Sequence, residues 1–273
     1  MSHNGETWSW DKMRMSRINY KKTLADAALD GVIPEGELAS PESMQKKALE
    51  ALKAWINRIE EGNIVTADRP KLTVPLSTAE QRVAQRKFGD FSEMNRRINV
   101  AYSQTTHERL KRDPSEWYLY HTLYSESRKG WQEIPYERIA KSLEHKPNWV
   151  IADFGCGEAK LADLLQNKIF CFDHIAINNK VTAVDIAHTP LQDNELDGVV
   201  FSLSLMGLNY KDYLKEAHRV TKFSGFLKIA EPISRWAGKR KQLLNEIEEI
   251  GFHLVKDIEE SFQFFYIEAI KLS

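Results

Sequence analysis

Hydrophobic positions alternate between two patterns after residue 147. Apolar runs of strand length cover residues 149–152, 169–172, 181–184, 198–205, 226–231, 252–257 and 262–270. Between several of them, apolar residues recur at helical spacing, over 161–165, 210–221 and 235–250. The fourth run is continuously apolar, which suits a parallel strand covered on both faces. The pattern predicts an α/β fold with a doubly wound, mostly parallel seven-stranded sheet, whose ligands bind at the carboxyl ends of the strands.

Helical spacing dominates the chain before residue 147. Apolar residues recur every three or four positions over 43–61, and the pattern is helical again over 78–127. Residues 62–78 contain Gly62, Pro70 and Pro75 among polar neighbours and read as a linker. We therefore expect three parts: a helical amino-terminal appendage (1–78), a helical lead-in (79–146) and the sheet-forming core (147–273).

Two segments before residue 147 are rich in basic side chains, which suggests a binding partner. Residues 1–24 mix aromatic and basic side chains, which fits a nucleic-acid arm and equally fits an amphipathic helix docked on the body. Between residues 78 and 127, bases outnumber acids. A solvated helix surface and a groove for an anionic substrate both explain that excess.

Composition narrows the class of protein only slightly. The 273-residue chain is 42% hydrophobic and has a formal net charge of −1, so the whole molecule has no charge that demands nucleic acid. The charge is +3 over residues 1–146 and −4 over residues 147–273. The two cysteines, Cys156 and Cys171, predict a reducing, intracellular compartment and no cysteine metal cluster. No apolar stretch approaches the length of a membrane span, so we expect no membrane partner.

The stretch around Asp153-Phe154-Gly155-Cys156-Gly157 joins a strand to a helix through a two-glycine turn. Glycines let a ligand approach the backbone, and the N–H groups at the start of the helix are expected to point at it. The loop lacks the third glycine of a dinucleotide fingerprint. Its D-x-G-x-G form resembles motif I of S-adenosylmethionine (SAM) methyltransferases, while a plain glycine turn is the alternative.

Three successive strands each end in an acid: Asp153, Asp173 and Asp185. Asp173 lies 18 residues beyond Gly155, a spacing that lets a strand-end carboxylate accept hydrogen bonds from a ribose diol. Carboxylates gathered along one rim of a sheet repel each other, so sheet stability alone does not explain them. A cofactor with an ammonium, two hydroxyls and an amino group would use all three. We expect their side chains to face one cleft.

These motifs together resemble the Rrp8 family, which includes nucleomethylin. The resemblance rests on Leu119-Tyr120-His121, Trp131, Ile139-Ala140, residues 152–157, Cys171-Phe172-Asp173, Asp185, Pro190-Leu191, residues 201–207 and Ala230-Glu231. It extends from about residue 80 to the end of the chain. It implies a Rossmann-like class I enzyme that uses SAM to methylate N1 of an adenine in large-subunit ribosomal RNA.

The resemblance also implies roles for single residues. His121 would cap the cofactor, although a lone histidine among aromatics is more often a packing residue. Gly155 would lie against the methionine part and Asp173 would hold the ribose. The full set of expected cofactor-binding residues is His121, Asp153, Gly155, Cys156, Gly157, Asp173, Asp185, Ile186 and Ser202. Two departures are Lys222-Phe223-Ser224-Gly225, where the family has a Lys-Pro-Gly-Gly turn, and an apolar Leu208 after Met206-Gly207. The eukaryotic members' basic nucleolar tail is missing, so we expect the cytoplasm, or the nucleolus for a eukaryotic protein.

The implied reaction asks little of side chains. Adenine N1 has a free lone pair and needs no base, so catalysis is mainly positioning. Glu231 is the candidate for favouring the developing positive charge, and a structural acid is the alternative. The base must be unpaired and stacked on an aromatic ring, which the sequence does not identify. We expect a monomer. The alternatives are a SAM-binding module that recruits partners without turnover, and a small-molecule or peptide methyltransferase.

Overall fold

A computed structural model of the chain describes residues 75–255 and 258–272. Its centre is an eight-stranded sheet with the order β3-β2-β1-β4-β5-β8-β6, and β7 pairs with β8 beside that path. The predicted helix over 43–61 and the predicted arm over 1–24 lie outside the described residues.

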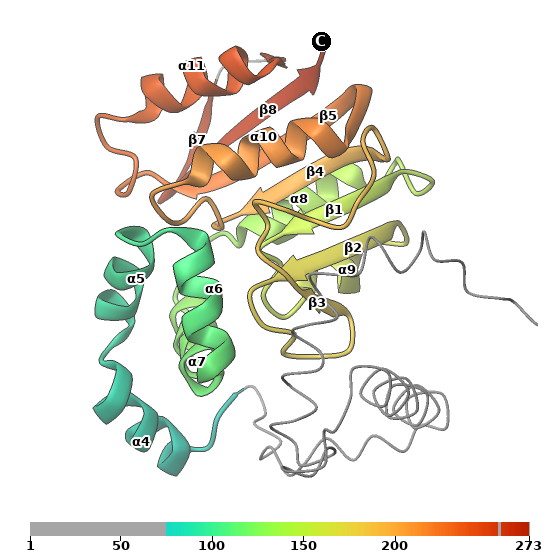
Figure 1. Cartoon of the computed structure of the whole chain (residues 1–273). Coiled ribbons are helices and arrows are strands. Elements are labelled where there is room, and N and C mark those ends of the chain that lie inside the picture. Colours follow the sequence, from blue (N-terminus) through green and yellow to red (C-terminus); the bar gives the residue numbers. More distant parts are fainter. Residues whose placement is uncertain (1–74, 256–257, 273) are drawn as a thin grey trace, which may run out of the picture. The chain divides into compact units, whose positions relative to one another are not determined.

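Parallel strands make up the first half of the sheet (Figure 1). They are β1 (Val150–Phe154), β2 (Lys168–Asp173), β3 (Val181–Ala183), β4 (Leu196–Ser202) and β5 (Thr221–Pro232). The strand β8 (Phe264–Lys271) is antiparallel to each of its neighbours β5, β6 (Phe252–Leu254) and β7 (Glu259–Ser261). The predicted α/β architecture with a mostly parallel sheet is confirmed, and β7 is a short addition to the seven predicted strands. β4 ends earlier than its apolar run because Leu203 adopts a left-handed φ of 61°.

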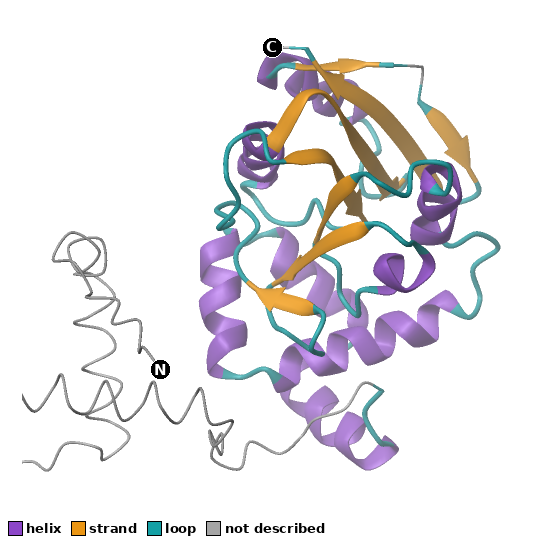
Figure 2. Ribbon diagram, turned by 90° about the vertical axis from the view of Figure 1, so that its right-hand side faces the viewer, coloured by secondary structure: helices purple, strands orange, loops and turns teal. Residues whose placement is uncertain are grey.

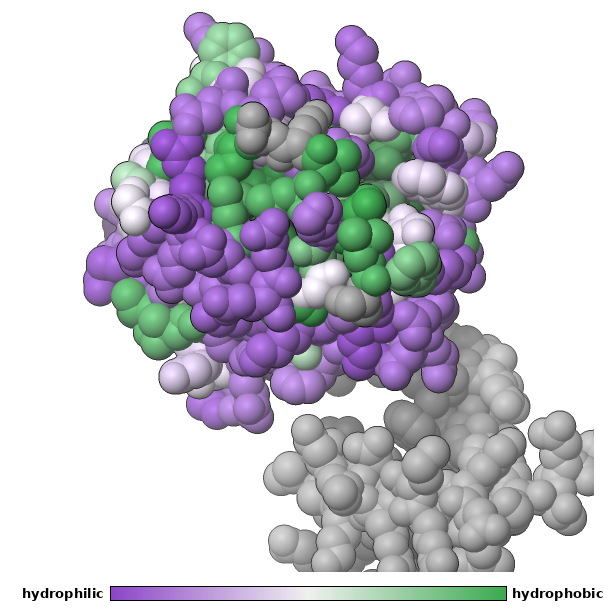
Figure 3. Space-filling view, turned by 90° about the horizontal axis from the view of Figure 1, so that it is seen from above, coloured by the Kyte–Doolittle hydropathy of each residue, from purple (hydrophilic) through white to green (hydrophobic). Residues whose placement is uncertain are grey.

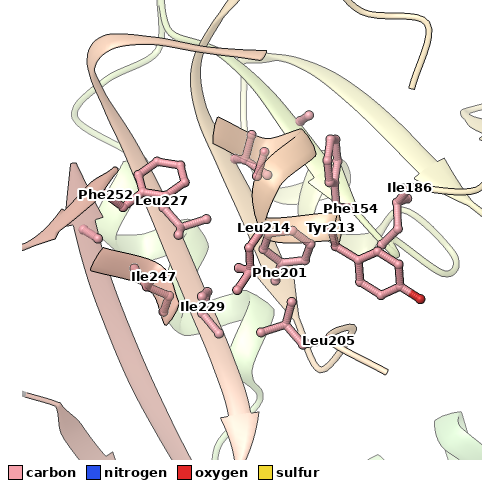
Figure 4. Packing of buried hydrophobic residues seen from close by; sticks show 14 of the residues in the cluster. Phe154, Ile186, Phe201, Leu205, Tyr213, Leu214, Leu227, Ile229, Ile247 and Phe252 are labelled. Carbon is pink, nitrogen blue, oxygen red and sulfur yellow. The ribbon is translucent and has the colours of Figure 1, made fainter. Parts of the chain in front are cut away.

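Helices cover both faces of the sheet (Figure 2). One face packs against α10 (Tyr210–Val220) and α11 (Arg240–Ile250), and the other against α8 (Pro135–Leu143) and the single turn α9 (Lys160–Leu164). Figure 4 shows the first interface, where Leu214 of α10 lies over Phe201 of β4 and Ile247 of α11 lies near Ile229 of β5. The alternation of side chains along β1 explains this double coverage, because Ile151 belongs to one core and Phe154 to the other.

Four further helices form a separate packed group, which we call the helical lobe: α4 (Thr78–Phe88), α5 (Phe91–Asn99), α6 (Ser103–Arg112) and α7 (Ser115–Arg128). Ser77 begins α4 with a capping box, in which its side chain and that of Glu80 each satisfy a backbone N–H of the other residue. Met94, Leu110 and Leu119 are fully buried at the centre of the lobe. Figure 1 shows α5, α6 and α7 beyond the carboxyl ends of the parallel strands, where α/β proteins bind their ligands.

The opposite edge of the sheet is also partly apolar. Phe226 in the middle of β5 pairs with Ile270 near the end of β8, so the exposed Phe223 and Leu272 lie toward the amino edge of the parallel strands. Figure 3 shows another side, the molecule seen from above Figure 1, where apolar side chains gather among polar ones. Among the described residues, none of the helices is both long and apolar enough to cross a bilayer.

Candidate functional site

A pocket lies between the carboxyl ends of β1, β2 and β4 and the helix α7. It holds about 880 Å³ of space outside the protein atoms, part of which is open to solvent. Strand ends contribute Asp153, Asp173 and Ser202, the motif loop contributes residues 155–158, and the helical lobe contributes aromatic side chains. Of the nine residues expected to bind the cofactor, eight line this pocket: His121, Asp153, Gly155, Cys156, Gly157, Asp173, Ile186 and Ser202. Their roles stay predictions.

The backbone N–H groups of residues 155–157 in the motif loop donate their hydrogen bonds to other atoms of the protein. The N–H groups of Gly155 and Cys156 both donate to the carbonyl oxygen of Phe172, at 2.8 and 3.0 Å. The N–H of Gly157 donates to Oδ2 of Asp173 at 2.7 Å. These three N–H groups are therefore not available to a ligand, and α9 is too short to carry much of a helix dipole. The expectation that the N–H groups at the start of the helix point at the ligand stays a prediction. Residues 155–157 therefore have no free N–H groups with which to bind an anion, which argues against a phosphate group at this position.

Both loop glycines are required by their surroundings. Gly155 and Gly157 have φ values of 78° and 55°, which favour glycine. A Cβ on Gly155 would lie 2.4 Å from Cβ of Ser204, and one on Gly157 would lie 2.7 Å from Cε1 of His121. Ser204 itself donates to the Phe154 carbonyl oxygen at 2.5 Å, which holds the loop after β4 against the motif loop.

Asp153 and Asp173 are the two buried acids that line the pocket. Each is only 3% exposed. Burial raises the pKa of Asp153 to about 7, and the neighbouring charge of Asp173 adds to the rise. Burial raises the pKa of Asp173 to about 6, against the lowering effect of hydrogen bonds from the N–H groups of Gly157 and His174. Oδ1 of Asp153 is buried and has no hydrogen-bond partner, although its residue lines the pocket.

Asp185 departs from the expectation that three acids share one cleft. It is not among the residues that line the pocket. Its Oδ2 accepts a hydrogen bond from the Ser103 hydroxyl at 2.7 Å, and its Oδ1 accepts one from the N–H of Ala187 at 3.1 Å. The strand β3 ends at Ala183, two residues before this acid, so Asp185 lies in a turn that links the sheet to α6. The sequence pattern predicts the position of the acid but not this hydrogen bond to a residue 82 positions away.

His121 and its neighbours give the pocket several polar atoms without partners. Burial lowers the pKa of His121 to about 3, and Arg128 lowers it further, so the imidazole is neutral. Neither ring nitrogen of His121 has a hydrogen-bond partner. The same holds for Nδ1 of His174 and Oγ of Ser202, both of residues that line the pocket. Buried polar groups are normally paired, so these atoms indicate a site built for a polar ligand.

These features fit SAM, the cofactor that the sequence suggests. A cationic group suits the unpaired Oδ1 of Asp153, because burial beside a second carboxylate favours positive charge there. Each carboxylate oxygen accepts more than one hydrogen bond, so Asp173 retains capacity for a ribose diol despite its two backbone donors. Aromatic rings supply an apolar lining.

Glu231 lies outside the pocket. It is fully buried, and its Oε1 accepts a hydrogen bond from the N–H of Leu205 at 2.9 Å. Its Oε2 accepts hydrogen bonds from Nη1 of Arg235 and Nε1 of Trp236, each at 3.0 Å. The carboxylate ties the loop after β4 to the segment after β5. This geometry fits the structural alternative and not the expected catalytic role.

Sequence reasoning missed a basic group on α7 at the rim of the pocket. The Arg128 guanidinium lies 4.8 Å from the Tyr124 ring centroid and forms an ion pair with Glu158 at 3.2 Å. Its Nη1 donates to the Tyr136 hydroxyl at 3.2 Å. All four residues line the pocket. Helical spacing was the available signal, because 121, 124 and 128 are positions i, i+3 and i+7 of one helix face.

Comparison with known proteins adds independent information. A family described as "Hypothetical methyltransferase" matches residues 78–273. "Ribosomal RNA-processing protein 8" of Mus musculus is 39% identical over 188 residues, which cover 68% of this chain and 41% of that protein. The Arabidopsis thaliana protein of the same name is 35% identical, over 70% of this chain and 68% of that protein. The "25S rRNA (adenine(645)-N(1))-methyltransferase" of Schizosaccharomyces pombe is 34% identical, over 71% of this chain and 64% of that protein. The chain thus matches about two fifths of the length of the mouse protein and about two thirds of the other two.

Proposed function

The chain belongs to the ribosomal RNA-processing protein 8 family, and we propose that it methylates N1 of an adenine in ribosomal RNA, using SAM. The observation that carries the proposal is the pocket at the carboxyl edge of the sheet, where a two-glycine loop and two buried carboxylates meet. The name of the fission yeast relative supports the adenine and the nitrogen atom.

Residues of this chain would hold the cofactor by three kinds of contact. Asp153 would accept from the ammonium, Asp173 would accept from the ribose, and the backbone of Gly155 and Gly157, which lines the pocket, would lie against the ligand. When bound, SAM supplies a methyl group on a positively charged sulfur. The neutral imidazole of His121 is compatible with this positively charged ligand, because it adds no charge that would repel a cation.

The chemistry then depends on positioning more than on proton transfer. N1 of adenine carries a lone pair, so no general base is needed, and the methylated base is a cation. The faces of aromatic rings attract cations, and Trp117, Tyr124 and Tyr213 line the pocket. The two carboxylates of the pocket act in the same direction, because they favour positive charge nearby. Glu231 is not needed for this step.

The helical lobe supports RNA as the substrate. Residues 78–112 contain eight lysines and arginines against four acids. Five of these bases are exposed and have no ion-pair partner among the described residues: Arg82, Arg86, Arg96, Lys111 and Arg112. Some cations of the core are instead paired with acids, as Lys180, Lys215 and Arg240 are. Unpaired cations on a lobe above the pocket suit a phosphate backbone.

Ribosomal RNA processing also bears on compartment and partners. The names of the relatives support an intracellular setting, with the nucleolus as the expectation for a eukaryotic protein, and they do not support the expected preference for the cytoplasm. Large-subunit RNA is the proposed target, since the fission yeast relative is named for a 25S RNA. The three-part division of the chain and the monomeric state stay predictions.

Two measurements made in parallel test this function. Calorimetry measures the affinity of the protein for SAM, and a filter assay measures transfer of labelled methyl from SAM to unmodified ribosomal RNA. The proposal predicts both binding and transfer, and it predicts that Asp173→Ala abolishes both. Binding without transfer to any RNA would support the alternative of a recruiting module. Transfer to small molecules or peptides but not to RNA would support the remaining alternative.

A further inference from the structure

Three exposed apolar side chains lie on the turn between α5 and α6 and on the loop between β4 and α10, two segments whose backbones are in contact. Val100 is 59% exposed, Tyr102 is 61% exposed and Leu208 is 55% exposed. The N–H of Leu208 donates to the carbonyl oxygen of Ala101 at 2.9 Å, which joins the two segments. We call Val100, Tyr102 and Leu208 the junction patch. Exposed apolar groups that gather at one place commonly mark a binding surface.

A partly buried polar cluster holds the junction patch in place. The N–H of Ser103 donates to Oδ1 of Asn209 at 2.9 Å, and Nδ2 of Asn209 donates back to the Ser103 hydroxyl at 2.9 Å. That hydroxyl in turn donates to Oδ2 of Asp185 at 2.7 Å. Ser103 is buried, whereas Asn209 and Asp185 are half-buried, so these bonds are partly shielded from water. The apolar side chains are thus displayed on a fixed support, and the carboxylate of Asp185 is part of it.

The junction patch adjoins the pocket. Ile98 and Met206, each two residues before a member of the patch, line the pocket, and so does Tyr213. The Tyr213 hydroxyl lies 3.1 Å from the place a Cβ on Gly207 would occupy. The backbone segments that carry the junction patch therefore also contribute residues to the pocket. The nearby α5 and α6 carry the unpaired cations Arg96, Lys111 and Arg112.

We propose that the junction patch receives the unpaired target base, with the ring of Tyr102 stacked on it and Leu208 supporting its edge. This proposal rests on the proposed function, because it places the substrate of that reaction. A nucleobase is a flat apolar surface attached to a phosphate backbone, and RNA-binding sites combine aromatic rings with cations in this way. The patch and the cations of the lobe provide both. Adenine N1 becomes accessible only after unpairing, so a stacking partner outside the pocket is required before the base enters it.

Substitutions at Tyr102 test this role through methyl transfer to ribosomal RNA. Tyr102→Ala removes the ring, and kcat/KM for RNA should fall about 5- to 150-fold, the range that one stacked base contributes. Tyr102→Phe keeps the ring and should keep the activity. SAM affinity should be unchanged in both variants, because Tyr102 does not line the pocket. Phe223→Ala is the matched control, since Phe223 is an equally exposed aromatic residue at the opposite edge of the sheet.

A second measurement does not depend on turnover. A single-stranded RNA that carries fluorescent 2-aminopurine at the target position should become less fluorescent on binding the wild-type protein, because stacking quenches this base. Tyr102→Ala should bind without that quenching. Equal transfer rates for wild type and Tyr102→Ala, or equal quenching by both, would overturn the assignment of Tyr102. Absence of transfer by the wild type with quenching that depends on Tyr102 would instead overturn the proposed function and leave the base-binding surface standing.

Discussion

Asp153 combines burial, a neighbouring acid and an acceptor oxygen without a partner. Such a carboxyl group titrates near neutrality, because its charged form lacks both water and hydrogen bonds, and its pKa is about 7. Asp173 differs in accepting two backbone hydrogen bonds, and its pKa is correspondingly lower, at about 6. At the residue scale, the site is therefore a pair of acids that a bound cation would complete.

Affinity for S-adenosylhomocysteine should depend on pH through Asp153. The pKa of about 7 means that the group is increasingly protonated below that pH, so affinity should weaken as pH falls, by at most about tenfold per pH unit. Asp153→Asn should bind weakly, and the pH dependence that remains should be that of Asp173, whose pKa is about 6. In the ligand-free protein, the pH dependence of stability has the opposite sign. The folded state binds the proton of Asp153 more tightly than the unfolded state does. The raised pKa therefore makes the unfolding free energy fall as pH rises from about 4 to about 7. Calorimetry across this pH range checks the first sign, and urea unfolding checks the second.

Glu231 should matter for stability more than for methyl transfer. Glu231→Ala leaves the Leu205 N–H and the Trp236 indole without their acceptor, and we expect the unfolding free energy to fall by about 2–5 kcal/mol. Urea unfolding measures this decrease. Activity per folded molecule should remain near that of the wild type, and a variant of normal stability without activity would restore Glu231 as a catalytic candidate.

At the scale of elements, the motif loop and α7 interlock. Gly157 leaves room for His121, and Ser204 after β4 lies against Gly155. The helix α7 brings His121 and Arg128 to the same pocket from one face. The site therefore depends on the packing of a helix from the lobe against a loop of the sheet.

A comparison of Gly157→Ala with Gly238→Ala distinguishes steric crowding of the new Cβ from backbone strain. Both glycines have positive φ, 55° and 73°, so alanine strains the backbone at either position by about 1–2 kcal/mol. Only at position 157 does the new Cβ meet another group, the buried His121 ring. We expect Gly157→Ala to weaken the affinity for S-adenosylhomocysteine by at least about tenfold, while Gly238→Ala keeps it. Equal affinities in calorimetry would show that the packing of the loop against His121 does not shape the site.

The sequence predicts most elements but not how they pack together. Apolar runs mark the strands because a parallel sheet buries both of its faces, and the strand-end acids mark its carboxyl edge. The left-handed Leu203 that ends β4 has no signal in an apolar run. The pairing of Ser103 with Asp185 and the burial of Glu231 beside Leu205 depend on how distant segments meet. Local patterns therefore locate the pocket, whereas tertiary packing decides which acids face it.

At the scale of the whole molecule, charge is divided between the lobe and the core. The described part of the lobe is rich in unpaired bases, while residues 147–273 carry a net charge of −4. Such a division directs a polyanion toward the lobe and away from the acidic core. Among these bases, Arg96 lies on α5, whose Ile98 lines the pocket, whereas the others lie on α4 and α6, which contribute no residue to the lining.

Reversing charges on the lobe should weaken RNA binding without affecting the cofactor. The triple variant Arg82→Glu, Arg86→Glu, Arg96→Glu should bind ribosomal RNA less tightly and with a shallower salt dependence. The log–log slope should decrease by about 0.7–0.9 for each phosphate that the variant no longer neutralises. The control triple Lys141→Glu, Lys239→Glu, Lys241→Glu changes the net charge equally on the core, and all three residues are exposed. Filter binding at several salt concentrations distinguishes the two, and equal weakening would indicate that net charge alone, and not the lobe, governs binding.

The most direct test of the central claim is the identity of the methylated nucleoside. Purified protein is incubated with SAM and unmodified large-subunit ribosomal RNA, and the RNA is digested to nucleosides and analysed by mass spectrometry. The pocket and the lobe predict 1-methyladenosine, formed by the wild type and absent with Asp173→Ala. A methyl group on another nucleoside, or no methylated nucleoside from a protein that binds SAM, would contradict the account.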